Sequence, residues 1–279
     1  MAKLSVSVMA HSSRAHLIPE LVQRLGIGVD RVTWDRIANR WDTGRRAWEA
    51  YDPDATHHMV LQDDAVVTRD LIPALEEALD HIPRNAIASP YIGTRRPQPQ
   101  KVIRAITAAR EAQASWIVMG SLNWGVGIII PTHAIEDMLP WCDQQPYPNY
   151  DKRIGQYFLK VKRWPTWCTW PSLVDHRDDE ESLCGHGPGR YAHEFLGQDH
   201  SALDVDFGRV HVVMNTAPPV PPAERRRRRQ EAAAERRQVR LRERKERRQA
   251  RIRGRRVERK KRLLGDPPPP DTENGDFFS

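Results

Sequence analysis

The first part of the chain alternates a β-type run, a helical run and a second β-type run. Residues 3–9 are the first strand candidate, residues 17–25 (LIPELVQRL) space their apolar side chains at helical intervals, and residues 30–34 (DRVTW) are the next strand candidate. This β-α-β order predicts an α/β fold with a mostly parallel sheet flanked by helices. Parallel sheets bind ligands at the carboxyl ends of their strands, so functional residues are expected there.

The alternation of strand and helix candidates continues beyond this opening. Further strands are expected at residues 58–61, 86–91, within the apolar stretch 116–130, and ending at 173–174. Helices are expected at residues 43–51, 71–81, 102–114, 131–141 and 150–159. Residues 93–100 hold two prolines and two arginines without periodicity and are expected to form a loop.

Charge is distributed unevenly along the chain. Residues 224–262 contain 21 Lys or Arg and 6 Asp or Glu, a net charge of +15, whereas residues 1–223 contain 23 Lys or Arg and 27 Asp or Glu, a net charge of −4. The basic balance of the whole chain therefore belongs to its tail. The expected organisation is a folded domain at residues 1–215, a proline-rich linker at 216–223, an Arg-rich tail at 224–264 that is helical or disordered, and a disordered acidic terminus at 265–279.

Cysteine usage and hydropathy limit the setting in which the chain works. Its three cysteines, Cys142, Cys168 and Cys184, have no C-x-x-C spacing, which argues against a disulfide framework and against a structural zinc site. The sequence has no 18-residue apolar run, and its N-terminal apolar run is too short for a signal peptide. A reducing, cytoplasmic setting is expected.

Two adjacent carboxylates, Asp63 and Asp64, directly follow a strand candidate in the sequence VLQDDAV (residues 60–66). Two neighbouring negative charges are costly to bury unless a cation neutralises them. At the carboxyl end of a strand they suit a hard divalent ion that also holds substrate phosphates. The alternative is a solvated turn in which one carboxylate caps a helix.

The surrounding sequence RWDTGRRAWEAYDPDATHHMVLQDDAVV (residues 40–67) resembles the signature of GT-A glycosyltransferases. In that family an acidic DxD-type motif ends a strand, and one carboxylate binds the Mn²⁺ or Mg²⁺ ion that bridges the diphosphate of the sugar donor. The resemblance implies that Asp63 and Asp64 take the place of this motif, with Asp64 the expected direct ligand. Because this chain has Q-D-D rather than D-x-D, the identity of the direct ligand stays open.

A second segment, PSLVDHR (residues 171–177), resembles the late GT-A strand whose following histidine completes the metal site. The resemblance implies that His176 is a metal ligand, and neutral imidazole is able to fill that role. The neighbouring Asp175 would then support the histidine or simply be solvated. The alternative for His176 is a surface histidine in a charged loop.

The resemblance also implies a donor-binding region. Nucleoside contacts are expected from the first βα turn (His11, Ser12, Ser13 and Arg14) and from Asp35 at the end of the second strand. Arg45 or Arg46 would neutralise the diphosphate, unless both are merely solvated on a short helix. The chain has no glycine-rich phosphate fingerprint, which disfavours a dinucleotide or P-loop site.

Three further segments are expected around the sugar and the acceptor. The segment NWGVGIIIP (residues 123–131) resembles the flank of the sugar pocket, where Gly125 permits close approach and Trp124 stacks on a ring, although a core strand with a bulge is equally compatible. Asp151 takes the place of the acidic base of inverting enzymes, or acts as a helix cap. Arg190, in the glycine-rich segment 184–193, belongs to a lid over the diphosphate or to a solvated connection.

Together these resemblances, which cover roughly residues 3–200, imply transfer of a sugar from a nucleotide-diphosphate sugar to an acceptor hydroxyl on a protein or a glycan. The Arg-rich tail is similar to those of glycosyltransferases encoded by actinobacterial phages, which implies a virion protein as acceptor and the host cytoplasm as location. The tail would bind a polyanion or recruit the acceptor, unless it only tethers or solubilises the enzyme. Two alternatives stay open: a metal-dependent hydrolase or nuclease using Asp63, Asp64 and His176, and a non-enzymatic nucleic-acid-binding protein.

Overall fold

The computed structural model describes residues 1–94, 99–179 and 189–214. The chain divides into two compact units, Met1–Thr216 and Ala217–Ser279, and the second lies outside the described residues. The expected linker, Arg-rich tail and acidic terminus fall outside them too and stay predictions. In the described part of the chain, no helix is both long enough and apolar enough to cross a membrane.

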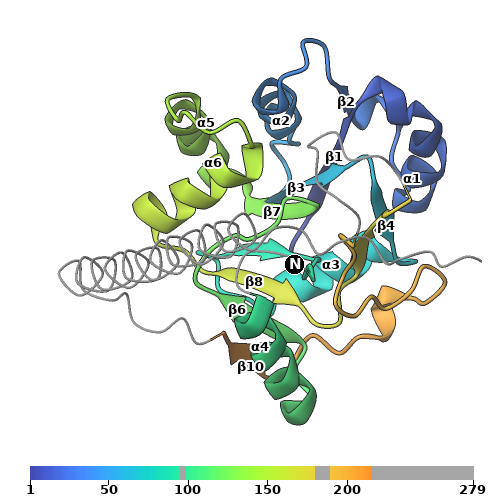
Figure 1. Ribbon diagram of the computed structural model, residues 1–279, viewed down its shortest axis with the longest axis vertical. Helices are drawn as coiled ribbons and strands as arrows, with labels where there is room; N and C mark the ends of the chain where they lie inside the picture. Colours follow the sequence, from blue (N-terminus) through green and yellow to red (C-terminus); the bar gives the residue numbers. More distant parts are fainter. Residues whose placement is uncertain (95–98, 180–188, 215–279) are drawn as a thin grey trace, which may run out of the picture. The chain divides into compact units, whose positions relative to one another are not determined.

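Eight strands form one sheet in the order β10-β6-β8-β5-β7-β3-β1-β2 (Figure 1). They are β1 (Leu4–Ala10), β2 (Val32–Trp34), β3 (His57–Gln62), β5 (Ile87–Ser89), β6 (Trp116–Met119), β7 (Gly127–Pro131), β8 (Thr166–Thr169) and β10 (His211–Val213). The pairs β1–β2, β1–β3, β5–β8 and β6–β10 are parallel, and β3–β7, β5–β7 and β6–β8 are antiparallel. The predicted α/β class with a mostly parallel sheet is confirmed.

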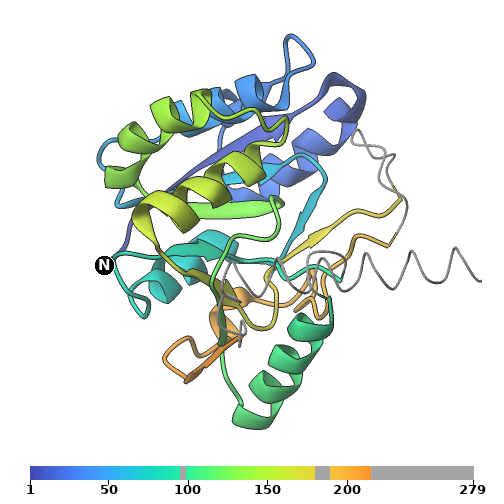
Figure 2. The same cartoon turned by 60° about the vertical axis from the view of Figure 1, so that its left-hand side comes forward.

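Helices cover both faces of this sheet. They are α1 (Ile18–Leu25), α2 (Arg40–Glu49), α3 (Leu71–Leu79), α4 (Pro99–Ala112), α5 (Ile135–Asp143) and α6 (Tyr150–Tyr157). The apolar sides of α1 and α3 pack on one face, and α2, α5 and α6 pack on the other through a core that includes Trp48, Met138 and Ile154. Figure 2 shows α5 and α6 side by side over β7. Because both faces are covered, β1 and β3 are almost wholly buried, as expected for central parallel strands.

Local sequence explains where α1 and α2 begin and end. Gly26 ends α1 in the left-handed conformation (φ 65°), which favours glycine, and its N–H bonds the last turn. The Asn39 side chain caps α2 by accepting the N–H groups of Trp41 and Asp42. For this reason α2 begins at Arg40 rather than at residue 43, where apolar spacing placed it.

Other expected elements were wrong in extent. The apolar stretch 116–130 contains two strands, β6 and β7, separated by a turn that holds Gly120 and Gly125. The helix expected at 131–141 begins at Ile135, because Pro131 still belongs to β7. Strand β8, strand β10 and a short strand β4 (Ala65–Val67) were not expected at all.

The buried histidine of β3 makes stability depend on pH. His58 is fully buried between Ser5 and the Ala47 carbonyl, with its Nδ1 2.7 Å from the Ser5 hydroxyl and its Nε2 2.9 Å from the carbonyl oxygen. Burial lowers the pKa of His58 to about 4, aided by the charge of Arg31, although hydrogen bonds to Ala47 and Ser5 oppose the shift. His58 is therefore neutral in the folded protein at every pH where the unfolded chain binds a proton at this residue.

Stability is thus expected to fall as pH drops from 6.5 toward 4, because only the unfolded chain binds this proton there. The contribution of His58 to the free energy of unfolding should be about 1.3 kcal/mol lower at pH 5.5 than at pH 7.5. Urea unfolding at both pH values measures the difference. His58→Gln should reduce the pH-dependent loss by that amount, whereas His81→Gln, at an exposed position, should not; equal losses in all three proteins would contradict this account.

Candidate functional site

The fold brings the expected donor-binding residues to one edge of the sheet. Strands β1, β2 and β3 are mutually parallel, so their carboxyl ends meet at this edge. His11 directly follows β1, Asp35 directly follows β2, and Asp63 directly follows β3. Chain direction alone therefore gathers side chains that lie far apart in the sequence.

A small separate sheet brings His176 to the same place. After the Asp63–Asp64 turn the chain forms β4, which pairs antiparallel with β9 (Val174–His176) so that Ala65 lies opposite His176. This pairing places Nε2 of His176 3.1 Å from Oδ2 of Asp64. The N–H of Arg177 also donates to the backbone carbonyl of Asp64 at 2.9 Å. The structure thus brings together the expected metal ligands Asp64 and His176.

Arg14 bridges the two carboxylates. It lies at a kink in the 3₁₀ segment Ser12–Leu17, and its Nη1 is 2.9 Å from Oδ1 of Asp63 and 2.6 Å from Oδ2 of Asp64. Oδ2 of Asp63 accepts the His11 N–H at 2.8 Å, so both oxygens of Asp63 are used within the protein. Oδ1 of Asp64, by contrast, is buried and has no hydrogen-bond partner among the described residues. The residue itself is only 3% exposed.

The two carboxyl groups differ in pKa. Burial and the negative charge of Asp64 raise the pKa of Asp63, although the His11 N–H and Arg14 partly oppose this. Burial also acts to raise the pKa of Asp64, but hydrogen bonding and charge from His176, together with the charge of Arg14, outweigh it and leave that pKa lowered. Asp64 is therefore the carboxylate that holds its negative charge most firmly.

The donor atoms of Asp64 and His176 fit a divalent cation. Nδ1 of His176 lies against the backbone carbonyl of Arg177, and because a carbonyl oxygen only accepts, Nδ1 carries the proton. In neutral imidazole the lone pair is then on Nε2, the atom that faces Asp64. Two neighbouring ligands of an octahedral ion with bonds of about 2.1 Å are about 3.0 Å apart, close to the observed 3.1 Å.

The protein supplies only part of a coordination shell. Within residues 1–94, 99–179 and 189–214, no three His, Cys, Asp or Glu side chains are grouped so that they could hold a metal ion. Asp63 does not extend the pair, because Arg14 and the His11 N–H use both its oxygens. Ions such as Mg²⁺ are often held by one or two carboxylates together with substrate phosphates, and this arrangement suits that kind of binding.

Two cavities meet at this point. The first has a volume of about 240 Å³ and includes Asp35, Asp63 and Asp64 in its lining, and the second has a volume of about 790 Å³ and includes Asp151 and His176. Four residues line both cavities: Arg40, Gln62, Tyr150 and Arg190. An ion held between Asp64 and His176 would therefore lie where the two cavities join.

Asp35 presents its carboxylate in the first cavity from a tight turn. One of its oxygens accepts from the Ile37 N–H at 3.2 Å and from the Thr43 hydroxyl at 3.2 Å. Burial acts to raise the pKa of Asp35, but these hydrogen bonds, together with one from the Asn39 N–H, outweigh it and lower that pKa. The side chain is thus a fixed, ionised acceptor for hydroxyl or N–H groups of a ligand.

The second cavity brings together the expected sugar and acceptor residues. Asp151 lies in the first turn of α6, and a Cβ atom added at Gly125 would be 2.9 Å from the Asp151 Cβ, so glycine permits this close packing. Trp124 meets the edge of Tyr91, with ring centroids 6.1 Å apart. Arg190 lines this cavity and the first, and its buried Nε has no hydrogen-bond partner among the described residues. Such a guanidinium group suits an anionic ligand.

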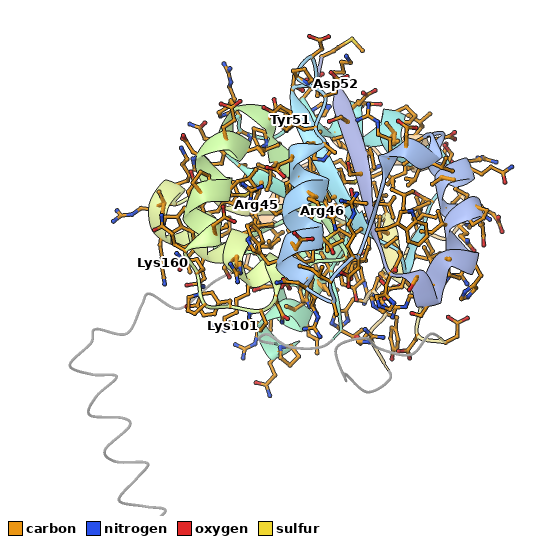
Figure 3. The ribbon with its side chains drawn as sticks, turned by 90° about the horizontal axis from the view of Figure 1, so that it is seen from above. Arg45, Arg46, Tyr51, Asp52, Lys101 and Lys160 are labelled. Atoms are coloured by element: carbon orange, nitrogen blue, oxygen red, sulfur yellow. The ribbon has the colours of Figure 1, made fainter. Side chains whose placement is uncertain are left out.

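Some expected contacts are not brought to the site. Arg45 lies on the outer side of α2 (Figure 3), where it pairs with Asp143 at 3.1 Å and with Glu49. Arg46 pairs with Asp42 at 3.0 Å, and neither arginine lines a cavity. Ser12 and Ser13 are exposed and line neither cavity, so of the first turn only His11 and Arg14 face the site. The expectation for Arg45, Ser12 and Ser13 thus gains no support from their placement.

Three residues of the shared lining were missed in the sequence. Arg40 begins α2 and donates to the Asn149 side chain at 2.7 Å, and Tyr150 is buried with its hydroxyl bonded to the Gly125 carbonyl. Gln62 precedes the Asp pair. The cap at Asn39 was the available signal for Arg40, because it places that residue at the helix start beside the sheet edge. Tyr150 carried no signal beyond its place next to Asp151.

Comparison of the chain with the models of known protein families found no match, and comparison with curated protein sequences found none either.

Proposed function

We propose that this protein is a metal-dependent glycosyltransferase that moves a sugar from a nucleotide-diphosphate donor to an acceptor hydroxyl. The observation that carries the proposal is the junction of two cavities at an Asp64–His176 pair whose donor atoms are 3.1 Å apart. A nucleoside would lie in the first cavity beside Asp35, and the sugar and the acceptor would lie in the second beside Trp124 and Asp151.

The chemistry divides between these two cavities. The acceptor oxygen forms a bond to the anomeric carbon, the bond from that carbon to the diphosphate oxygen breaks, and the electron pair leaves with the diphosphate. Asp151 takes the hydroxyl proton if the reaction inverts the anomeric carbon. A divalent ion bound by Asp64 and His176 supplies charge stabilisation for the departing diphosphate. Arg40 and Arg190, which line both cavities, add positive charge at the same position.

The proposal is tested by incubating the protein with a panel of nucleotide-diphosphate sugars and measuring release of the nucleoside diphosphate. Water serves as the acceptor in this assay, so the natural acceptor is not needed. Release with Mn²⁺ and its loss on chelation are expected for one nucleotide class. Cleavage of DNA or RNA, without release of a nucleoside diphosphate from any donor, would instead establish the metal-dependent nuclease.

Placement of the two arginines predicts which of them binds the diphosphate. Arg40→Met should weaken binding of the nucleoside diphosphate about tenfold or more, because a charged hydrogen bond contributes about 1.5–3 kcal/mol. Arg45→Met is the matched control on the same helix and should leave the affinity unchanged, since Arg45 pairs with Asp143 away from the cavities. Isothermal titration measures both. A larger loss in Arg45→Met would place the diphosphate on the outer side of α2.

A further inference from the structure

The carboxylate pair is already partly neutralised within the protein. Nη1 of Arg14 contacts both Asp63 and Asp64, and the arginine and both carboxylates are at most 5% exposed. Burial acts to lower the pKa of Arg14, but the charges of Asp64 and Asp63 outweigh it and leave that pKa raised, so the guanidinium stays charged. With His176 neutral, the three side chains together carry a net charge of only −1.

A divalent ion at Asp64 would have to share this carboxylate with Arg14. The Asp64 oxygen nearest to His176, Oδ2, is the one that Arg14 contacts at 2.6 Å, and only Oδ1 has no hydrogen-bond partner among the described residues. A fixed positive charge next to the ion repels it, and the repulsion is weakly screened because the site is buried. The free protein should therefore bind the ion weakly.

A nucleoside diphosphate changes this balance. Its phosphate oxygens would complete the coordination shell that the protein leaves open, and its negative charges would offset the repulsion from Arg14. On this basis, which rests on the proposed function, we infer that Arg14 makes ion binding and diphosphate binding depend on each other. Arg14 lowers the affinity of the free protein for the ion, so that the ion binds firmly only together with the diphosphate.

The inference assigns Arg14 a positioning role rather than a catalytic one. It also gives the first βα turn a function that differs from the nucleoside contact expected from the sequence. Arg14 ties the turn after β1 to the turn after β3, and the His11 N–H makes the same connection through Asp63. Neutralising Arg14 therefore changes the charge at the site while the His11 contact still holds the turn.

The test is the affinity of the full-length protein for Mn²⁺ alone, measured from the electron paramagnetic resonance signal of the free ion. Arg14→Met should bind Mn²⁺ roughly tenfold tighter than the wild type, because removing one charge beside a divalent ion is a large electrostatic change. Arg14→Lys keeps the charge and should stay close to the wild type. Arg24→Met, on the neighbouring helix α1 and paired with Glu20, is the matched control and should show no change.

A second measurement needs no variant and holds even if Arg14→Met fails to fold. The wild type should bind Mn²⁺ at least tenfold tighter in the presence of a saturating nucleoside diphosphate than in its absence. Equal affinities in the two conditions, or Mn²⁺ binding in Arg14→Met that is no tighter than in the wild type, would overturn the inference. If no nucleoside diphosphate binds under any condition, the proposed function itself fails, which is a different result.

Discussion

Asp64→Asn is expected to reduce nucleoside diphosphate release about 10³-fold or more, with the fold retained. The substitution removes the carboxylate whose Oδ1 is unpaired and whose Oδ2 faces Nε2 of His176. Loss of the ion at the leaving group removes several kcal/mol of transition-state stabilisation, and 10³-fold corresponds to about 4 kcal/mol. The rate of release from the preferred donor, at saturating Mn²⁺, measures the effect.

Two controls separate a loss of chemistry from a loss of structure. Asp54→Asn, at an exposed position in the turn before β3, should leave the rate unchanged. The thermal midpoint of Asp64→Asn without ligand shows whether the protein is folded, because Asp63 still pairs with Arg14 in that variant. A folded Asp64→Asn protein with near-normal activity would remove the metal site from the mechanism.

Asp151→Asn is expected to reduce sugar transfer by 10² to 10⁴-fold, the usual range for a general base. The carboxylate lies in the second cavity, at the start of α6 and against Gly125, whereas the expected nucleoside residues line the first. The loss should therefore appear in kcat of transfer, with binding of the donor unchanged. Steady-state kinetics together with donor titration separate these two quantities.

The control for this variant is Asp137→Asn on the neighbouring helix α5, where the carboxylate pairs with Lys162 at the surface. That substitution should not change kcat. If Asp151→Asn transfers sugar at the normal rate, Asp151 is only a helix-capping residue, and analysis of the product anomer would then be expected to show retention rather than inversion.

The sequence predicted most strands and helices of the N-terminal half because their periods are local. Strands β1, β2 and β3 and helices α1 and α3 lie within a few residues of their expected ranges. The antiparallel members of the sheet were not predictable in the same way. Strand β7 runs between β3 and β5 because of pairing with residues far away in the chain, and β10 pairs with β6 across an even longer separation.

The site shows the same limit at the level of side chains. The grouping of His11, Asp35 and Asp64 follows from strand direction, so a β-α-β pattern was sufficient to predict it. The bridge from Arg14 to both carboxylates depends on the kink at Arg14 (φ −113°, ψ 19°), which no local pattern indicates. The diphosphate residue was placed at Arg45 rather than Arg40 because apolar spacing alone set the start of α2 too late.

The most direct test of the central claim is thermal unfolding of the wild type with a panel of nucleoside diphosphates, with Mn²⁺ and with chelator. A ligand that binds only the folded state at about 100-fold excess over its Kd should stabilise it by about 2.7 kcal/mol. A rise in Tm for one nucleotide class, seen with Mn²⁺ and absent with chelator or in Asp64→Asn, is the predicted result. An unchanged Tm across the whole panel, or an equal rise in the presence of chelator, would contradict a metal-dependent donor site at Asp64 and His176.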